Sequence, residues 1–196
     1  MGLFEQHLRM AQMSSDKSAE ANALGNLGLC LRATNDLDRA ASLFQQQLAL
    51  TRQIEDFRGS ASALSNLGSV MLSRGDLVHA TTAYEEAIAI ARHLSDKWQE
   101  NRLIGNLGNA YLAAGQPAAA IDAYAQQIEL SRIIGDRLSE GNALWNSAIA
   151  LEASGNISAA IAYAREALQI RQHLRDPGAA KISEWLRSHG VDSVAS

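Results

Sequence analysis

A 40-residue repeat runs through almost the whole chain and constrains its fold more than any other feature. Four asparagines mark the repeat: Asn26, Asn66, Asn106 and Asn146. The first three follow Gly or Ser and precede Leu-Gly, whereas the fourth stands in the altered phrase Trp-Asn-Ser-Ala. Other residues recur in the same register: Ala40, Ala80, Ala120 and Ala160; Phe44, Tyr84 and Tyr124; Asp56, Asp96, Asp136 and Asp176. Such a repeat predicts a stack of similar supersecondary units with a continuous core.

Each repeat predicts two helices joined by a tight turn. Leu64, Leu67 and Met71 lie on one face of a helix, because apolar residues at i, i+3 and i+7 share a side, and the other repeats match them. Gly75 suits the left-handed end of the first helix, as do Gly115, Gly155 and, in the first repeat, Asn35; Asp76 suits the N-cap of the second helix. No alternating apolar run predicts a strand. The expected helices cover residues 18–33, 37–54, 58–73, 77–94, 98–113, 117–134, 138–153 and 157–174.

The register divides the chain into repeats 17–56, 57–96, 97–136 and 137–176. Residues 1–16 match the second helix of a preceding repeat, because Phe4 and Leu8 lie one full period before similar residues of the first repeat. The partner of that helix is missing, so either the chain is cut from a longer protein or this edge packs against a second copy. Residues 177–189 predict a capping helix and residues 190–196 a frayed tail.

Composition narrows the class of protein. Apolar residues make up 47% of the chain and charged residues 19%, with a net charge of −4 at pH 7. Such a chain lacks the basic surface that nucleic acids and anionic membranes attract. The single cysteine, Cys30, excludes a disulfide framework and aligns with small residues, which predicts a buried side chain. No apolar run approaches the roughly 18 residues of a spanning helix. We expect a cytoplasmic protein with no nucleic-acid partner and no membrane insertion.

The sequence offers no set of residues typical of catalysis. The histidines lack the spacing of metal ligands, and no Ser/His/Asp or Cys/His arrangement is indicated. The Gly-x-x-x-x-Gly-Lys-Ser/Thr phosphate loop is absent. We therefore expect no enzymatic activity, no catalytic residue, no metal and no cofactor.

The motif Leu-Gly-x-x-Tyr/Leu, followed by Gly, Ala, Tyr/Phe and Ala-Ile/Leu, resembles the tetratricopeptide repeat in a lengthened, 40-residue form. The longer form is similar to the repeats of spindle-orientation scaffolds and of kinesin light chain. The resemblance implies an all-α fold, a right-handed α-solenoid of stacked antiparallel helix pairs.

A narrower resemblance covers about the last sixty residues. The phrases Gly135-Asp136-Arg137, Glu140-Gly141-Asn142-Ala143-Leu144-Trp145-Asn146 and Asp176-Pro177-Gly178-Ala179-Ala180-Lys181 resemble the C-terminal sensor arrays of bacterial STAND-type signalling NTPases. Because the chain has no phosphate loop, any NTPase would lie outside it.

The resemblance implies that the first helix of each pair lines a concave groove that binds a peptide or partner. The stripe opposite the packed face of each first helix, which includes Gly25, Ser65, Gly105 or Trp145, would then meet the ligand. The predicted binding residues on and beside these stripes are Asn22, Asn26, Ser62, Asn66, Ser69, Arg102, Asn106, Asn109, Asn142, Trp145 and Asn146. The repeated asparagines either bind a peptide backbone or bond to neighbouring helices and fix the spacing of the repeats.

Two further side chains have competing interpretations. Arg102 either binds a ligand carboxylate or pairs with a glutamate of the next repeat. Trp145 is either an exposed anchor for a ligand side chain or packs beneath the C-terminal cap. Trp98, like Trp185, is expected in the core where helices join.

The sequence favours a non-catalytic interaction module, a scaffold or sensor that binds a peptide or an extended partner segment in its groove. One alternative is self-association into a homodimer through the open N-terminal edge at Phe4 and Leu8. The other is a regulatory sensor arm of a larger signalling NTPase or protease.

Overall fold

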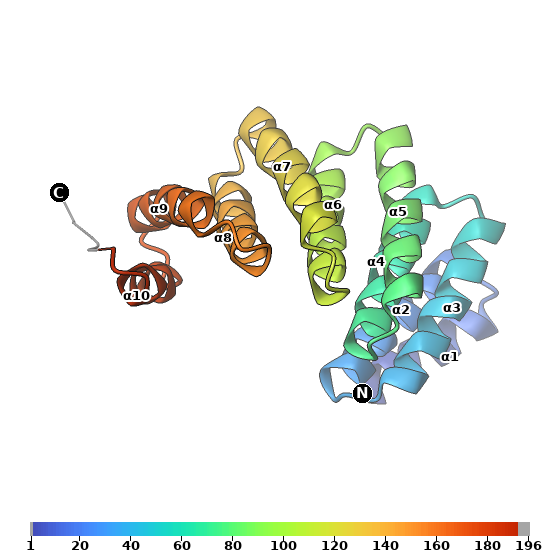
Figure 1. The fold of residues 1–196 in the computed structure, drawn as a ribbon. Coiled ribbons are helices and arrows are strands. Elements are labelled where there is room, and N and C mark those ends of the chain that lie inside the picture. The colour runs from blue at the N-terminus through green and yellow to red at the C-terminus, as the bar shows by residue number, and fades with distance from the viewer. Residues whose placement is uncertain (1, 192–196) are drawn as a thin grey trace. The chain divides into compact units, whose positions relative to one another are not determined.

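The computed structural model of the chain describes residues 2–191. Within them every regular element is an α-helix, which confirms the all-α repeat fold (Figure 1). The helices are α1 (Gly2–Met13), α2 (Lys17–Ala33), α3 (Leu37–Gln53), α4 (Phe57–Ser73), α5 (Leu77–His93), α6 (Lys97–Ala113), α7 (Pro117–Ile134), α8 (Arg137–Ala153), α9 (Ile157–His173) and α10 (Ala179–Ser188). Each of α2 to α9 begins and ends within one residue of its predicted range.

The helices α2 to α9 begin at a constant 20-residue interval, because the same cap precedes nearly all of them. Six side chains each accept a hydrogen bond from the backbone N–H three residues later: Asp16, Asp36, Asp56, Asp76, Asp136 and Asn156. The Asp96 side chain accepts in the same way from the Gln99 N–H. At α7, Gln116 makes no such bond and Pro117 supplies a preset first turn.

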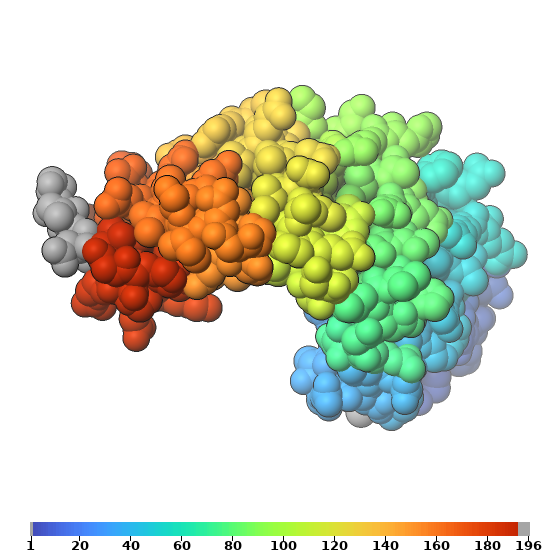
Figure 2. All heavy atoms as spheres, viewed as in Figure 1, coloured from blue at the N-terminus to red at the C-terminus, as the bar shows by residue number. Residues whose placement is uncertain are grey.

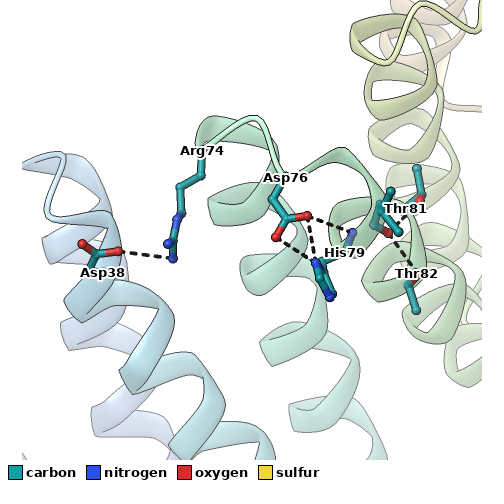
Figure 3. Close-up of polar contacts among 7 residues, drawn as sticks. Asp38, Arg74, Asp76, His79, Thr81 and Thr82 are labelled. Carbon is teal, nitrogen blue, oxygen red and sulfur yellow. Dashed lines mark hydrogen bonds and ion pairs between the residues drawn. The ribbon is translucent and has the colours of Figure 1, made fainter.

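One of these caps carries a second contact. At the start of α5 the Asp76 carboxylate faces the His79 ring, with Nδ1 2.8 Å from each carboxylate oxygen (Figure 3). This hydrogen bond from His79 holds the pKa of Asp76 below its ordinary value. Nearby, Arg74 reaches Asp38 of α3 at 3.2 Å.

A left-handed residue closes the helix before each cap. The predicted positions Asn35, Gly75, Gly115 and Gly155 have φ between 62° and 82°. The structure adds a second set that the sequence analysis missed, at the joints between repeats: Ser15, Glu55, Ser95, Gly135 and Arg175. Four of these five residues are not glycine, so their residue types do not indicate a positive φ. Only their position in the repeat could have predicted it.

The chain divides into two compact units between Leu103 and Ile104, inside α6. In the N-terminal unit (residues 2–103), α2 packs against α1, α3 and α4, and α4 also packs against α5. In the C-terminal unit (residues 104–191), α8 packs against α7 and α9, and α10 packs against α9 (Figures 1 and 2). The finer division into four repeats stays a prediction of the sequence.

An aromatic ring lies on a glycine in three of the helix pairs. Phe44, Tyr84 and Tyr124 are at most 1% exposed and lie against Gly28, Gly68 and Gly108. A Cβ added at Gly68 would stand 2.8 Å from Cε1 of Tyr84, so only glycine leaves room for the ring. In the fourth pair the ring and the glycine are both replaced by alanine, at Ala164 and Ala148, which are fully buried.

The helix α10 covers the end of the C-terminal unit. Its Ile182 and Leu186 are each 1% exposed, within a cluster that includes residues of α8 and α9. Trp185 meets Trp145 edge to face, with ring centroids 5.6 Å apart, and its Nε1 donates to Glu152 Oε2 at 2.9 Å. The predicted frayed tail lies largely outside the described residues, since only 190 and 191 of it are described.

Two expectations about burial are wrong. Trp98 is 61% exposed, because it stands on the outward side of the first turn of α6 and not at a packed joint. Cys30 is half-buried rather than buried, although it aligns with small side chains.

Candidate protein-interaction face

The predicted binding residues lie on α2, α4, α6 and α8, and we name the outward surface of these helices in each unit its first-helix face. The N-terminal unit carries α2, α4 and the first turns of α6, and the C-terminal unit carries the rest of α6 and α8. The middle of each predicted stripe is buried instead of exposed, at Gly25, Ser65, Gly105 and Trp145. At Gly25 the reason is Gln47 of α3, whose Nε2 lies 2.6 Å from where a Cβ would stand. Each first-helix face is therefore narrower than the sequence indicated.

In the N-terminal unit, most predicted residues have uncommitted side chains. Asn22, Asn26 and Arg102 are exposed, and Ser62 and Asn66 are partly exposed. Within residues 2–191 none of these five side chains makes a hydrogen bond or ion pair. Their polar groups therefore remain available to a ligand.

Ser69 is the exception among the predicted residues of this unit. Its hydroxyl donates to the Ser65 carbonyl at 3.0 Å and lies 3.1 Å from the Tyr84 hydroxyl. Burial raises the pKa of Tyr84, although the hydrogen bond with Ser69 opposes this. Tyr84 is not among the residues that the sequence predicted for the site. Its signal was the change from Phe44 to Tyr84 at the repeated aromatic position.

In the C-terminal unit, the predicted asparagines mostly bond to the protein itself. Asn109 Oδ1 accepts hydrogen bonds from the Tyr124 hydroxyl at 2.7 Å and from Asn146 Nδ2 at 3.2 Å. Asn142 Oδ1 accepts a hydrogen bond from Nη2 of Arg171. The amides of Asn142 and Asn146 are therefore bonded within the protein, as the structural alternative for the repeated asparagines expects. Asn106 makes no side-chain hydrogen bond within residues 2–191.

Trp145 is not the exposed aromatic that one interpretation required. It is 8% exposed and packs against Trp185, so its ring lies beneath the C-terminal cap. The sequence could not decide between the two alternatives, because the burial of this ring depends on where α10 docks.

The N-terminal edge also differs from expectation. Phe4 and Leu8 are half-buried and pack onto the cluster that includes Leu27 and Phe44, so α1 buries them within its own unit. The exposed apolar side chains of α1 are instead Leu3, Met10 and Met13.

Comparison with known families decides the class of protein. A tetratricopeptide repeat family model matches residues 20–93 and 99–173. The chain belongs to the tetratricopeptide repeat family. Tetratricopeptide repeats are in general non-catalytic modules for protein interaction, so the fold indicates an interaction scaffold with protein partners. No curated protein matches the chain by sequence.

Several solved structures share the fold of this chain. BtubC (BKLC) from P. vanneervenii has a TM-score of 0.83 and 17% identity, over 89% of this chain and 72% of that protein. TPR-like repeats attributed to a kinesin light chain of Podosopora anserina give 0.76 and 17%, over 89% and 86%. A STAND protein with a tetratricopeptide repeat sensor from Pyrococcus horikoshii gives 0.78 and 18%, over 91% of this chain but 29% of that protein. The resemblances to kinesin light chain repeats and to the sensor of a STAND protein are thus confirmed as likenesses of fold.

Residues 2–191 hold no group of three or more His, Cys, Asp or Glu side chains placed to bind a metal ion. None of the helices in the described part of the chain is long and apolar enough to span a bilayer.

Proposed function

We propose that the protein binds an extended segment of a partner protein along the first-helix face of the N-terminal unit. The observation that carries the proposal is the state of two repeated asparagines. Asn26 and Asn66 recur at 40-residue spacing, reach the surface and make no side-chain hydrogen bond within residues 2–191. A purely structural ladder would have its amides bonded to neighbouring helices, as Asn146 is.

Amide side chains suit an extended ligand. Each carboxamide offers two N–H donors and a carbonyl acceptor, which match the alternating groups of a peptide backbone. The ligand backbone would be recognised whatever its sequence, and charged groups of the face would add specificity. Arg102, exposed and without an ion pair in the described residues, is the side chain of the predicted set that can bind a carboxylate.

The test compares two double variants in capture from a lysate of the source cells. Asn26→Ala/Asn66→Ala removes two amides from the first-helix face. The matched control Gln45→Ala/Gln53→Ala removes two exposed amides from α3, which lies outside that face. We expect the native chain and the control to recover the same partner and the asparagine variant to lose it, with all three melting at nearly the same temperature.

Two outcomes would contradict the proposal. If the asparagine variant recovers the partner as well as the native chain does, the partner binds elsewhere. If the asparagine variant melts several degrees lower than the control, the amides have a structural role.

A further inference from the structure

A partly exposed hydroxyl, that of Ser69, and a buried one, that of Tyr84, meet at the first-helix face of the N-terminal unit. The Tyr84 ring comes from α5 and is 1% exposed, and its hydroxyl lies 3.1 Å from the Ser69 hydroxyl of α4. Because Ser69 donates its only hydroxyl proton to the Ser65 carbonyl, Tyr84 is the donor in this contact. A hydroxyl proton can rotate toward a ligand, and the buried ring fixes the position of its oxygen.

Two arginines stand beside this hydroxyl pair. Arg32 precedes Ser69 by the same sequence separation that places Asn109 and Asn146 in contact between neighbouring first helices. Since α2 and α4 pack together, the same register puts Arg32 opposite Ser69. Arg102 follows Ser65 by this same separation, which puts it opposite the helical turn of α4 that precedes Ser69. Burial raises the pKa of Tyr84, and the charges of Arg32 and Arg102 oppose this rise, in agreement with both placements.

Neither guanidinium is neutralised by the protein. Other arginines of the same unit form ion pairs: Arg39 with Asp36, Arg52 with Glu86, Arg74 with Asp38, and Arg92 with Glu100. Within residues 2–191, Arg32 and Arg102 have no such acid partner. The arrangement does not recur, because the residues one repeat after Arg32 and Arg102 are Leu72 and Asn142.

We propose that Arg32, Arg102 and the Ser69–Tyr84 hydroxyl pair form a subsite for an oxyanion, the carboxylate or phosphate group of a side chain on the bound segment. This inference rests on the proposed function and names the chemistry that the ligand brings to one place on the face. Guanidinium groups bind planar or tetrahedral oxyanions with two parallel hydrogen bonds, and hydroxyls complete the set of donors.

The subsite is tested with the isotope-labelled full chain by nuclear magnetic resonance. Inorganic phosphate and, separately, sodium acetate are added at constant ionic strength, and the Nε–Hε signals of the arginines are followed. We expect saturable shifts at Arg32 and Arg102, with dissociation constants of about millimolar for such small ions. The anion that binds more tightly identifies a phosphate or a carboxylate as the better ligand.

Two variants keep the result interpretable. Tyr84→Phe removes only the hydroxyl and introduces the residue that the first repeat has at Phe44, so the fold is retained. It should weaken anion binding about tenfold, the effect of losing one hydrogen bond to a charged group. Arg58→Gln removes an exposed arginine of α4 and should leave the affinity unchanged.

The proposal is overturned if the shifts do not saturate, if Arg58 responds as strongly as Arg32, or if Tyr84→Phe binds both anions as the native chain does. These results are separable from a failure of the proposed function. Partner capture that survives the loss of Asn26 and Asn66 would refute peptide binding through the amides, whereas localised anion shifts would still establish the subsite.

Discussion

The two units carry the same repeat but differ in how most of its predicted asparagines are used. In the N-terminal unit, Asn22, Asn26 and Asn66 present free amides at the surface. In the C-terminal unit, Asn142 and Asn146 bond to Arg171 and Asn109. Asparagines of the same repeat are thus unbonded at some positions and bonded to the protein at others. The difference depends on whether the chain supplies a partner for the amide.

The largest expected effect concerns Trp145, because its substitution tests whether the C-terminal unit uses this ring for packing or for binding a ligand. Trp145→Ala should destabilise this unit by about 3–5 kcal/mol, because it leaves a cavity beneath Trp185. Hydrogen exchange should rise in α8, α9 and α10 and stay unchanged in α2 to α4. Partner recovery lost from a variant with normal exchange would instead make this ring a ligand anchor.

A smaller effect separates two asparagines at the same repeat position. Asn142→Ala should cost about 1–3 kcal/mol, because it leaves Nη2 of Arg171 without its acceptor in a side chain that is 15% exposed. Asn22→Ala should change the free energy of unfolding by less than about 0.5 kcal/mol, since its amide has no partner within the described residues. Urea unfolding of the two variants measures the contrast, and equal costs would remove the distinction between the units.

The smallest effect is a dependence on pH at one cap. The folded-state pKa of Asp76 is lowered by His79, so its contribution to stability is present above the unfolded-state pKa and is lost as pH falls through the folded one. The equivalent cap of α9 is Asn156, which does not titrate in this range. Carboxyl carbon resonances should show Asp76 titrating below an ordinary aspartate, and His79→Ala should move it back up. An unchanged titration in His79→Ala would assign the shift to another cause.

The helices could be predicted from the sequence because their signals are local. Asp76 at the cap and Gly75 before it fix a boundary within a few residues, and the 40-residue period transfers this boundary to every repeat. The same period could have revealed the left-handed joints at Ser15 and Glu55, since Gly135 occupies the corresponding place.

The candidate site could be predicted only in part, because the state of a side chain depends on residues distant in the sequence. Asn142 and Asn22 are indistinguishable by position, and only Arg171, on the following helix, engages one of them. Trp145 is buried by α10, and Gly25 by an amide from α3. Helical periodicity gives the direction of a side chain from its own axis, but it does not give what another helix places there.

The constant interval between helix starts has a consequence for how such a chain is assembled. Joints inside repeats and joints between repeats have the same length. Both kinds have a residue in the left-handed conformation before the cap, and nearly all have the same kind of cap. The backbone therefore does not distinguish first helices from second helices. Side chains make that assignment, with Gly68 on one helix and Tyr84 on the next. The connectors are therefore alike throughout, and in three of the helix pairs a glycine on the first helix and an aromatic ring on the second distinguish the two helices.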